Sequence, residues 1–159
     1  MADDPLRIAL DEAGVGYELL KHRRTETAAD EAAALAVAPE EVAKTLVLTT
    51  REGHARLLLP ASRRIDMAKV RETLGDGKHV RLATEEELER DYPQFELGAV
   101  PPVGGRRDPL LVDRRLAERE SVLFEAGRHD ESVWVRTSDL LELGKAQIGD
   151  LCEEEDRSR

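Results

Sequence analysis

The sequence predicts a mixed α/β domain with a largely antiparallel sheet and short helices. Its 159 residues are 40% hydrophobic, which is enough for one core of substantial size. Strand-like and helix-like segments alternate irregularly, and two pairs of strand-like segments are separated by turns, as in β-hairpins. No internal repeat, long linker or second composition regime divides the chain. We therefore expect one domain over residues 1–150, followed by a charged flexible tail over residues 151–159.

The expected helices are set by their start and stop signals. They cover residues 6–13, 28–36, 39–43, 67–74 and 139–143, with a further short acidic helix that ends before Pro93. Four are preceded by a residue whose side-chain oxygen can cap the first turn: Thr27, Asp66, Thr84 and Ser138. Three end at a glycine, which readily adopts the left-handed conformation that closes a helix: Gly14, Gly75 and Gly144.

Strands are expected at residues 17–20, 44–49, 55–59, 80–82, 110–112, 121–125 and 132–136. Side chains alternate along a strand, so Lys44 shares a face with Leu46 and Leu48. An ammonium on an apolar face must reach the rim or meet an anion, because burying it unpaired is costly. Lys44 is therefore either an anion anchor over a cleft or a strand-edge lysine whose stem covers Leu46.

Residues 98–105 form an expected loop with the sequence Gly-Ala-Val-Pro-Pro-Val-Gly-Gly. Its two prolines cannot donate backbone hydrogen bonds, and its three glycines tolerate unusual dihedral angles. Such a shaped loop can present backbone N–H groups to a ligand.

Composition excludes several classes of function. The formal charge of −10 argues against a protein built to bind nucleic acid over its whole surface, and five aromatic residues are too few for a platform that stacks bases. The single cysteine, Cys152, excludes an internal disulfide and fits a reducing compartment. No targeting segment or membrane-length apolar run is present. We expect a cytoplasmic protein with no membrane and no DNA partner.

The sequence also lacks the usual catalytic motifs. The four histidines stand far apart without ligand spacing, so we expect no metal, and no Walker loop or Gly-x-Ser-x-Gly elbow is present. What remains is Lys44 and the 98–105 loop, which together could bind an oxyanion or a carbonyl that becomes one.

The motifs around these residues resemble the YbaK-like aminoacyl-tRNA deacylases, a family similar to the editing domain inserted in bacterial prolyl-tRNA synthetases. Residues 43–48 resemble the lysine strand of the family, residues 59–66 its Pro-x-x-x-Arg-x-Asp segment, and residues 98–102 its Gly-x-x-x-Pro loop. Leu111-Val112-Asp113 and Glu125-Ala126-Gly127 resemble the strand and turn that follow. The motifs occur in family order and span about residues 17–143.

This resemblance implies one compact domain with a barrel-like sheet, which hydrolyses the ester between a wrong amino acid and its tRNA without a cofactor. Lys44 would be the catalytic residue. The residues implied to bind the substrate are Thr45, Gly98, Ala99, Val100, Pro101, Pro102, His22 and Gly127. The expected partners are the acceptor end of a mischarged tRNA and a possible aminoacyl-tRNA synthetase, with the protein itself a monomer.

Three positions depart from the family pattern: Arg23, Pro101 and Val103 stand where many relatives have Pro, Ser and Phe. Pro101 and Val103 border the expected amino-acid pocket, so the sequence leaves open which amino acid is removed.

Arg63, Arg64, Arg106 and Arg107 are candidate contacts to tRNA phosphates, or surface arginines paired with abundant carboxylates. His129, in the turn after Gly127, could reach the ligand, but it is interpreted as a solvated turn residue.

Two other functions stay open. A non-catalytic protein could bind an aminoacyl ester or the tRNA acceptor end together with a synthetase. An esterase acting on small metabolites would use Lys44 without any salt-sensitive RNA contact.

Overall fold

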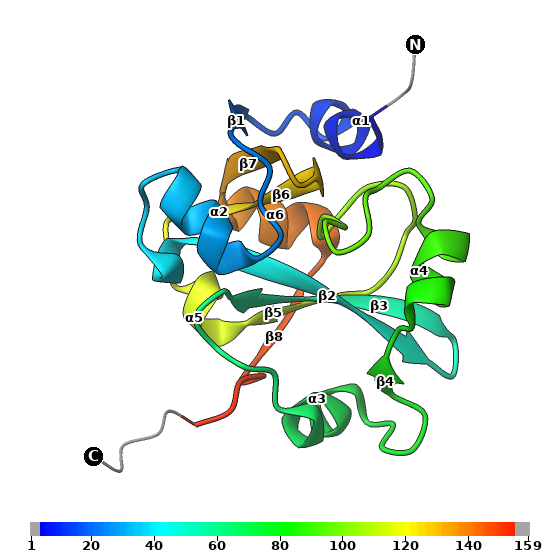
Figure 1. Ribbon diagram of the computed structural model, residues 1–159. Helices are drawn as coiled ribbons and strands as arrows, with labels where there is room; N and C mark the ends of the chain where they lie inside the picture. The colour runs from blue at the N-terminus through cyan, green and yellow to red at the C-terminus, as the bar shows by residue number, and fades with distance from the viewer. Residues whose placement is uncertain (1–3, 155–159) are drawn as a thin grey trace.

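Two β-sheets with helices around them make up residues 4–154, the part of the chain that the computed structural model describes (Figure 1). In chain order the elements are α1 (Pro5–Glu12), β1 (Tyr17–Lys21), α2 (Ala28–Ala34), η1 (Pro39–Glu41), β2 (Ala43–Thr50), β3 (Gly53–Pro60), α3 (Met67–Leu74), β4 (Arg81–Leu82), α4 (Glu85–Asp91), β5 (Leu110–Asp113), α5 (Arg114–Ala117), β6 (Ser121–Arg128), β7 (Glu131–Arg136), α6 (Thr137–Gly144) and β8 (Gln147–Gly149).

The larger sheet has the strand order β4-β2-β3-β5-β8 and contains the Lys44 strand. β2 and β3 form the predicted antiparallel hairpin. β5 and β8 extend the sheet in parallel, whereas β4 pairs with β2 only at Leu48 and Thr49. The first half of β2 therefore has an edge that β4 leaves uncovered, and Lys44 lies in that half.

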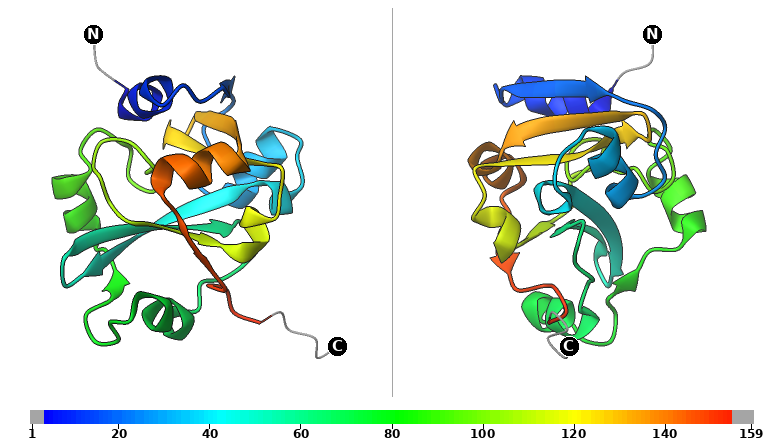
Figure 2. Two further views of the ribbon diagram at one scale, coloured as in Figure 1. Left: turned by 180° about the vertical axis from the view of Figure 1, so that it is seen from behind. Right: turned by 60° about the vertical axis from the view of Figure 1, so that its left-hand side comes forward.

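The smaller sheet has the order β1-β7-β6 and is antiparallel throughout. It lies over the larger sheet (Figure 2). A single parallel bridge between Val42, just before β2, and Leu123 of β6 joins the two sheets. β2 and β6 thus run in the same direction as they leave this bridge.

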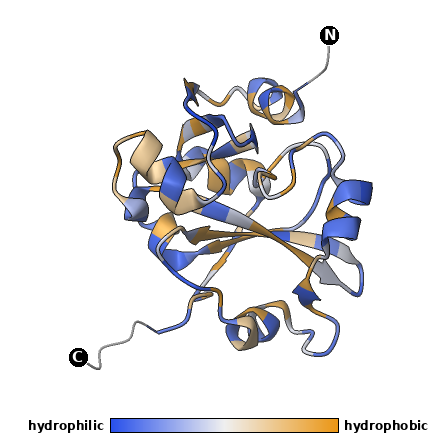
Figure 3. Cartoon of the chain, in the orientation of Figure 1, coloured by the Kyte–Doolittle hydropathy of each residue, from blue (hydrophilic) through white to orange (hydrophobic). Residues whose placement is uncertain are grey.

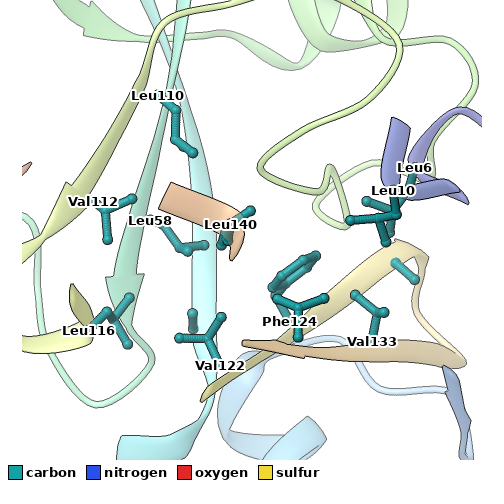
Figure 4. Close-up of a cluster of buried hydrophobic side chains, with 13 residues drawn as sticks. Leu6, Leu10, Leu58, Leu110, Val112, Leu116, Val122, Phe124, Val133 and Leu140 are labelled. Atoms are coloured by element: carbon teal, nitrogen blue, oxygen red, sulfur yellow. The ribbon is translucent and has the colours of Figure 1, made fainter. Parts of the chain in front are cut away.

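The main core fills the space between the sheets. Leu58 of β3, Phe124 of β6 and Leu140 of α6 are at most 1% exposed and meet there (Figure 4). Leu6 and Leu10 of α1 close one end of this cluster. The strands of the larger sheet are mainly apolar, whereas α4 is mostly hydrophilic and contributes no fully buried residue (Figure 3). Burial of strand side chains on both faces explains why the larger sheet is so apolar.

The mixed α/β class is confirmed, and so are the predicted caps Thr27, Asp66 and Thr84. Three details differ. The two sheets do not close into the expected barrel. The short elements α5 and β8 carry no clear pattern in the sequence and were not expected. The last helix begins at Thr137, before the predicted cap Ser138. None of the helices in residues 4–154 has the length and apolar character needed to span a membrane.

The predicted tail starts later than residue 151. Leu151 and Cys152 are fully buried, and the Leu151 N–H donates to Asp113 at 3.0 Å while its carbonyl accepts from the Asp66 N–H at 2.9 Å. The backbone of Cys152 forms an isolated antiparallel β-bridge with that of Ile65. Residues 151 and 152 therefore link the end of β5 to the segment before α3. The sequence did not predict this contact, because the charged residues from Glu153 onward are typical of a tail. Residues 155–159 of the predicted tail lie outside the described part.

Candidate active site

A pocket of about 320 Å³ lies where β2 and β6 leave the Val42–Leu123 bridge. Lys44 and Glu125 each lie two residues beyond the bridge, so a parallel register sets them at corresponding positions on the two strands. The remaining walls come from the start of α2 and from the loop after α4. The lining residues are Glu26, Thr27, Ala28, Ala29, Ala43, Lys44, Thr45, Leu46, Ala61, Gly98, Ala99, Val100 and Glu125.

Lys44 is a half-buried lysine without a partner. Its Nζ makes no hydrogen bond or ion pair within residues 4–154. Burial lowers the pKa of Lys44 below its usual value, and the positive charge of Arg64 acts in the same direction. Leu46 and Leu48, on the same face of β2, belong to the apolar cluster beneath the strand. Lys44 thus lines the pocket with the hydrogen-bonding capacity of its ammonium unused within the described residues.

The predicted loop provides two further donors. Pro101 and Pro102 have no N–H, and the N–H of Ala99 donates to the Glu96 carbonyl at 3.0 Å. The N–H groups of Gly98 and Val100 make no hydrogen bond within the described residues. Both residues line the pocket with Lys44. This combination of an ammonium and two N–H groups suits an oxygen that gains negative charge.

Arg56 of β3 holds this loop in place. Its side chain is 1% exposed and donates to the carbonyls of Pro101 at 2.9 Å and Gly104 at 2.7 Å. Its Nε also pairs with Asp108 at 3.1 Å, and Asp108 accepts from the Tyr92 hydroxyl at 2.7 Å. A buried guanidinium is tolerated only when it is paired and hydrogen-bonded, and this network satisfies that condition.

Glu125 faces the pocket from β6 and is paired with His129. Glu125 Oε2 lies 2.8 Å from His129 Nδ1, and His129 Nε2 lies 2.7 Å from the Leu97 carbonyl oxygen. A carbonyl can only accept, so Nε2 carries a hydrogen and the proton of Nδ1 is shared with Glu125. Burial raises the pKa of Glu125 to about 7. His129 is 3% exposed, so its interpretation as a solvated turn residue is wrong.

A second buried acid lies behind this pair. Glu31 of α2 is fully buried, and its Oε2 bonds the hydroxyl of Ser132, the residue opposite Glu125 in the β6–β7 pair. Ser132 Oγ is also 2.9 Å from His22 Nε2. Burial raises the pKa of Glu31 to about 8. Two carboxyl groups with raised pKa values therefore act on each other, with Glu125 at the pocket wall and Glu31 behind it.

The structure brings only some of the predicted substrate-binding residues together. Lys44, Thr45, Gly98, Ala99 and Val100 all line the pocket. The others lie elsewhere. The Pro101 carbonyl accepts a hydrogen bond from Arg56. Pro102 lines a separate groove beside α1, and Gly127 packs against Phe95. His22 reaches the site indirectly, through Ser132.

The four candidate arginines fall into two groups. Arg63 and Arg64 precede α3, and the charge of Arg64 acts on Lys44. Arg106 and Arg107 line the groove beside α1, whose volume is about 1110 Å³ and which Lys44 does not line. Arg106 is also engaged, because it stacks on Tyr92 and pairs with Asp108. None of the four lines the pocket, and Arg64 is the one whose charge acts on a lining residue.

Sequence reasoning missed Glu125, Glu31 and Ser132. A weak signal existed: Glu125 interrupts the apolar run Val122-Leu123-Phe124, and Glu31 interrupts an alanine-rich helix. A charge in such surroundings is rarely buried without a function or a partner. Within residues 4–154 no group of three or more His, Cys, Asp or Glu side chains could hold a metal ion.

Comparison with known proteins identifies the relatives of this fold. A model of the aminoacyl-tRNA editing domain family matches residues 22–143. No curated protein sequence matches the chain. A solved structure described as "hypothetical protein APE2540" is 28% identical with a TM-score of 0.84, and the match covers 93% of this chain and 99% of that one. Another, described as "a putative trans-editing enzyme for prolyl tRNA synthetase", is also 28% identical with a TM-score of 0.84, and the match covers 97% and 100%.

Proposed function

Because this chain belongs to the aminoacyl-tRNA editing domain family, we propose that it hydrolyses the ester bond of mischarged aminoacyl-tRNA and releases the free amino acid and the tRNA. The observation that carries the proposal is that Lys44, Gly98 and Val100 line one pocket, while the Lys44 ammonium and the two N–H groups have no hydrogen-bond partner within the described residues. The relative named for trans-editing with prolyl-tRNA synthetase supports action on a free, already charged tRNA.

The proposed chemistry is attack of water on the ester carbonyl carbon. A tetrahedral oxyanion forms, the bond from carbon to the ribose oxygen breaks, and that oxygen leaves as a hydroxyl after taking up a proton. Lys44 and the loop N–H groups stabilise the oxyanion, and one such donor contributes on the order of 3 kcal/mol. The neighbouring hydroxyl of the terminal ribose assists the attacking water. Lys44 orients and stabilises rather than attacks.

Pocket size favours a small amino acid. The volume of about 320 Å³ has to hold both the aminoacyl group and part of the terminal ribose, and it lies at the low end of the usual range for ligand sites. Larger side chains are therefore excluded by volume. Since charged tRNA is used where translation takes place, we expect the protein to work in the cytoplasm.

Lys44→Ala provides the test. A panel of mischarged tRNAs first identifies the substrate of the wild-type protein, and single-turnover hydrolysis of that substrate is then measured for the variant. Loss of one preorganised donor should slow the reaction about 100-fold or more. Lys78→Ala, at an exposed lysine outside the pocket, is the matched control and should keep the wild-type rate.

A folded Lys44→Ala protein with the full rate would remove Lys44 from the mechanism. Wild-type protein that binds an aminoacyl-tRNA stoichiometrically but never turns it over would favour the binding function instead. Hydrolysis of small esters with no dependence on the RNA would favour the metabolite esterase.

A further inference from the structure

The pocket carries two opposite charges that do not pair with each other. Lys44 on β2 and Glu125 on β6 both line it, and no ion pair within 4.0 Å joins them. The two residues belong to strands of different sheets, so they line the pocket from two sides. A ligand that fills this space meets a cation at one wall and a carboxylate at the other.

Glu125 has one oxygen left for such a ligand. Its Oε2 is used by His129, whereas its Oε1 makes no hydrogen bond within the described residues. The side chain is 12% exposed and lines the pocket. His129 is anchored to the Leu97 carbonyl, next to Gly98, and so fixes the carboxylate relative to the donor loop. Glu125 is therefore a rigid and partly unused acceptor.

An aminoacyl ester has matching charges. Its α-ammonium stands one carbon away from the carbonyl, and that carbonyl becomes an oxyanion in the reaction. We propose that Glu125 binds the α-ammonium group of the substrate while Lys44 binds the carbonyl oxygen, so that the enzyme acts on esters of amino acids with a free amino group. This inference rests on the proposed function and adds the substrate class: N-acylated esters, such as those of peptidyl-tRNA, are excluded.

Two glutamates line the pocket, and the proposal assigns the binding of the α-ammonium group to only one of them, Glu125. Glu26 also lines the pocket, but it is 68% exposed and pairs with Arg24 at 3.2 Å. Its charge is therefore screened by water and already neutralised. Glu125 lies in a buried environment where a bound ammonium gains more from the pairing. Glu26 serves as the matched control.

The test compares two substrates that differ only in charge. One is the tRNA charged with the amino acid that the wild-type protein hydrolyses, and the other is its α-hydroxyacyl counterpart, made by nitrous acid deamination. The second-order rate constant for each ester is measured in single turnovers with the protein in excess. It is divided by the rate at which the same ester hydrolyses in buffer, which corrects for the different reactivity of the two esters. Wild type should prefer the aminoacyl ester about 10-fold or more, because a charge-assisted hydrogen bond is replaced by a neutral one.

Glu125→Gln keeps the size of the side chain and removes its charge. It should lower the rate for the aminoacyl ester about 10-fold and leave the rate for the α-hydroxyacyl ester near that of wild type. Glu26→Gln should keep the wild-type preference. Circular dichroism and thermal unfolding check that both variants are folded.

Other outcomes would overturn the inference. Equal loss on both esters would mean that Glu125 acts on the water or only supports the fold. A wild-type protein without a preference for the aminoacyl ester overturns the inference with no variant needed, so a misfolded Glu125→Gln protein does not block the test. If wild type hydrolyses neither ester, the proposed function itself fails.

Discussion

At the scale of single residues, the site depends on carboxyl groups that are kept away from water. Glu31 shows this most clearly, because it is fully buried, its Oε2 bonds Ser132, and its Oε1 has no partner in the described residues. An unpaired oxygen is cheaper to bury on a neutral carboxyl than on a carboxylate. This explains why burial raises the pKa of Glu31 to about 8.

Glu31→Gln should stabilise the protein at alkaline pH. The pKa of Glu31 is about 8 in the folded state and near 4.5 when unfolded, so between these values the folded state binds more protons and its stability falls as pH rises. Glutamine does not titrate, and its amide can still bond Ser132. The difference in unfolding free energy between the variant and the wild type should therefore be roughly 2–4 kcal/mol more favourable to the variant at pH 8 than at pH 5. Urea unfolding at both pH values measures this difference. If the variant and the wild type differed by the same unfolding free energy at pH 5 and pH 8, Glu31 would be ionised in the folded protein over this whole range.

At the scale of elements, the donor loop owes its shape to β3 as much as to its own sequence. The glycines and prolines of residues 98–105 predicted a shaped loop, and the structure confirms one. Its anchor, Arg56, lies in the middle of a predicted strand, and no pattern around it indicates that it points to this loop. Local sequence therefore reveals the flexibility of the backbone but not the contact that removes it.

Arg56→Met should destabilise the fold and loosen the loop. The substitution leaves Asp108 without its buried partner, and breaking a buried pair in this way costs about 3–5 kcal/mol. Hydrogen exchange should become faster at the amide of Ala99, which is hydrogen-bonded to the Glu96 carbonyl, and chemical denaturation gives the loss of stability. Arg106→Met is the matched control, since this exposed arginine also pairs with Asp108. Equal effects of the two substitutions would contradict an anchoring role for Arg56.

At the scale of the whole molecule, a net charge of −10 restricts any RNA contact to one region. Arg64 is the best placed of the candidate arginines, because its charge acts on Lys44. The segment that carries it is fastened by the end of the described chain, where the Glu153 N–H donates to the Arg64 carbonyl at 2.8 Å. Arg64 therefore adds, on a held segment of an otherwise acidic protein, a cation whose charge reaches Lys44.

Arg64→Ala should weaken binding of an acceptor-stem minihelix and reduce its salt dependence. Loss of one phosphate contact lowers the slope of log affinity against log salt concentration by about one. Binding titrations at several salt concentrations give this slope. Arg51→Ala is the control, because Arg51 is exposed in the β2–β3 turn at the other end of the Lys44 strand. An unchanged slope for Arg64→Ala would exclude a phosphate contact.

The sequence was most informative where the signal is local. Caps, turns and alternation predicted most helices and both hairpins. Alternation placed Lys44 on an apolar strand face with two roles open to it, and the family resemblance implied the catalytic one. Glu125, Glu31 and Ser132 escaped because only the register of β6 with β7 and the packing of α2 bring them together. Glu31 and Ser132 are 101 residues apart in sequence, a separation at which no periodic pattern carries information.

The Val42–Leu123 bridge gives the pocket a property that neither sheet has by itself. The pocket is lined from both sheets, so its residues come together only when the two sheets are packed against each other. A substitution that loosens the packing between the sheets is therefore expected to disturb the pocket along with the fold.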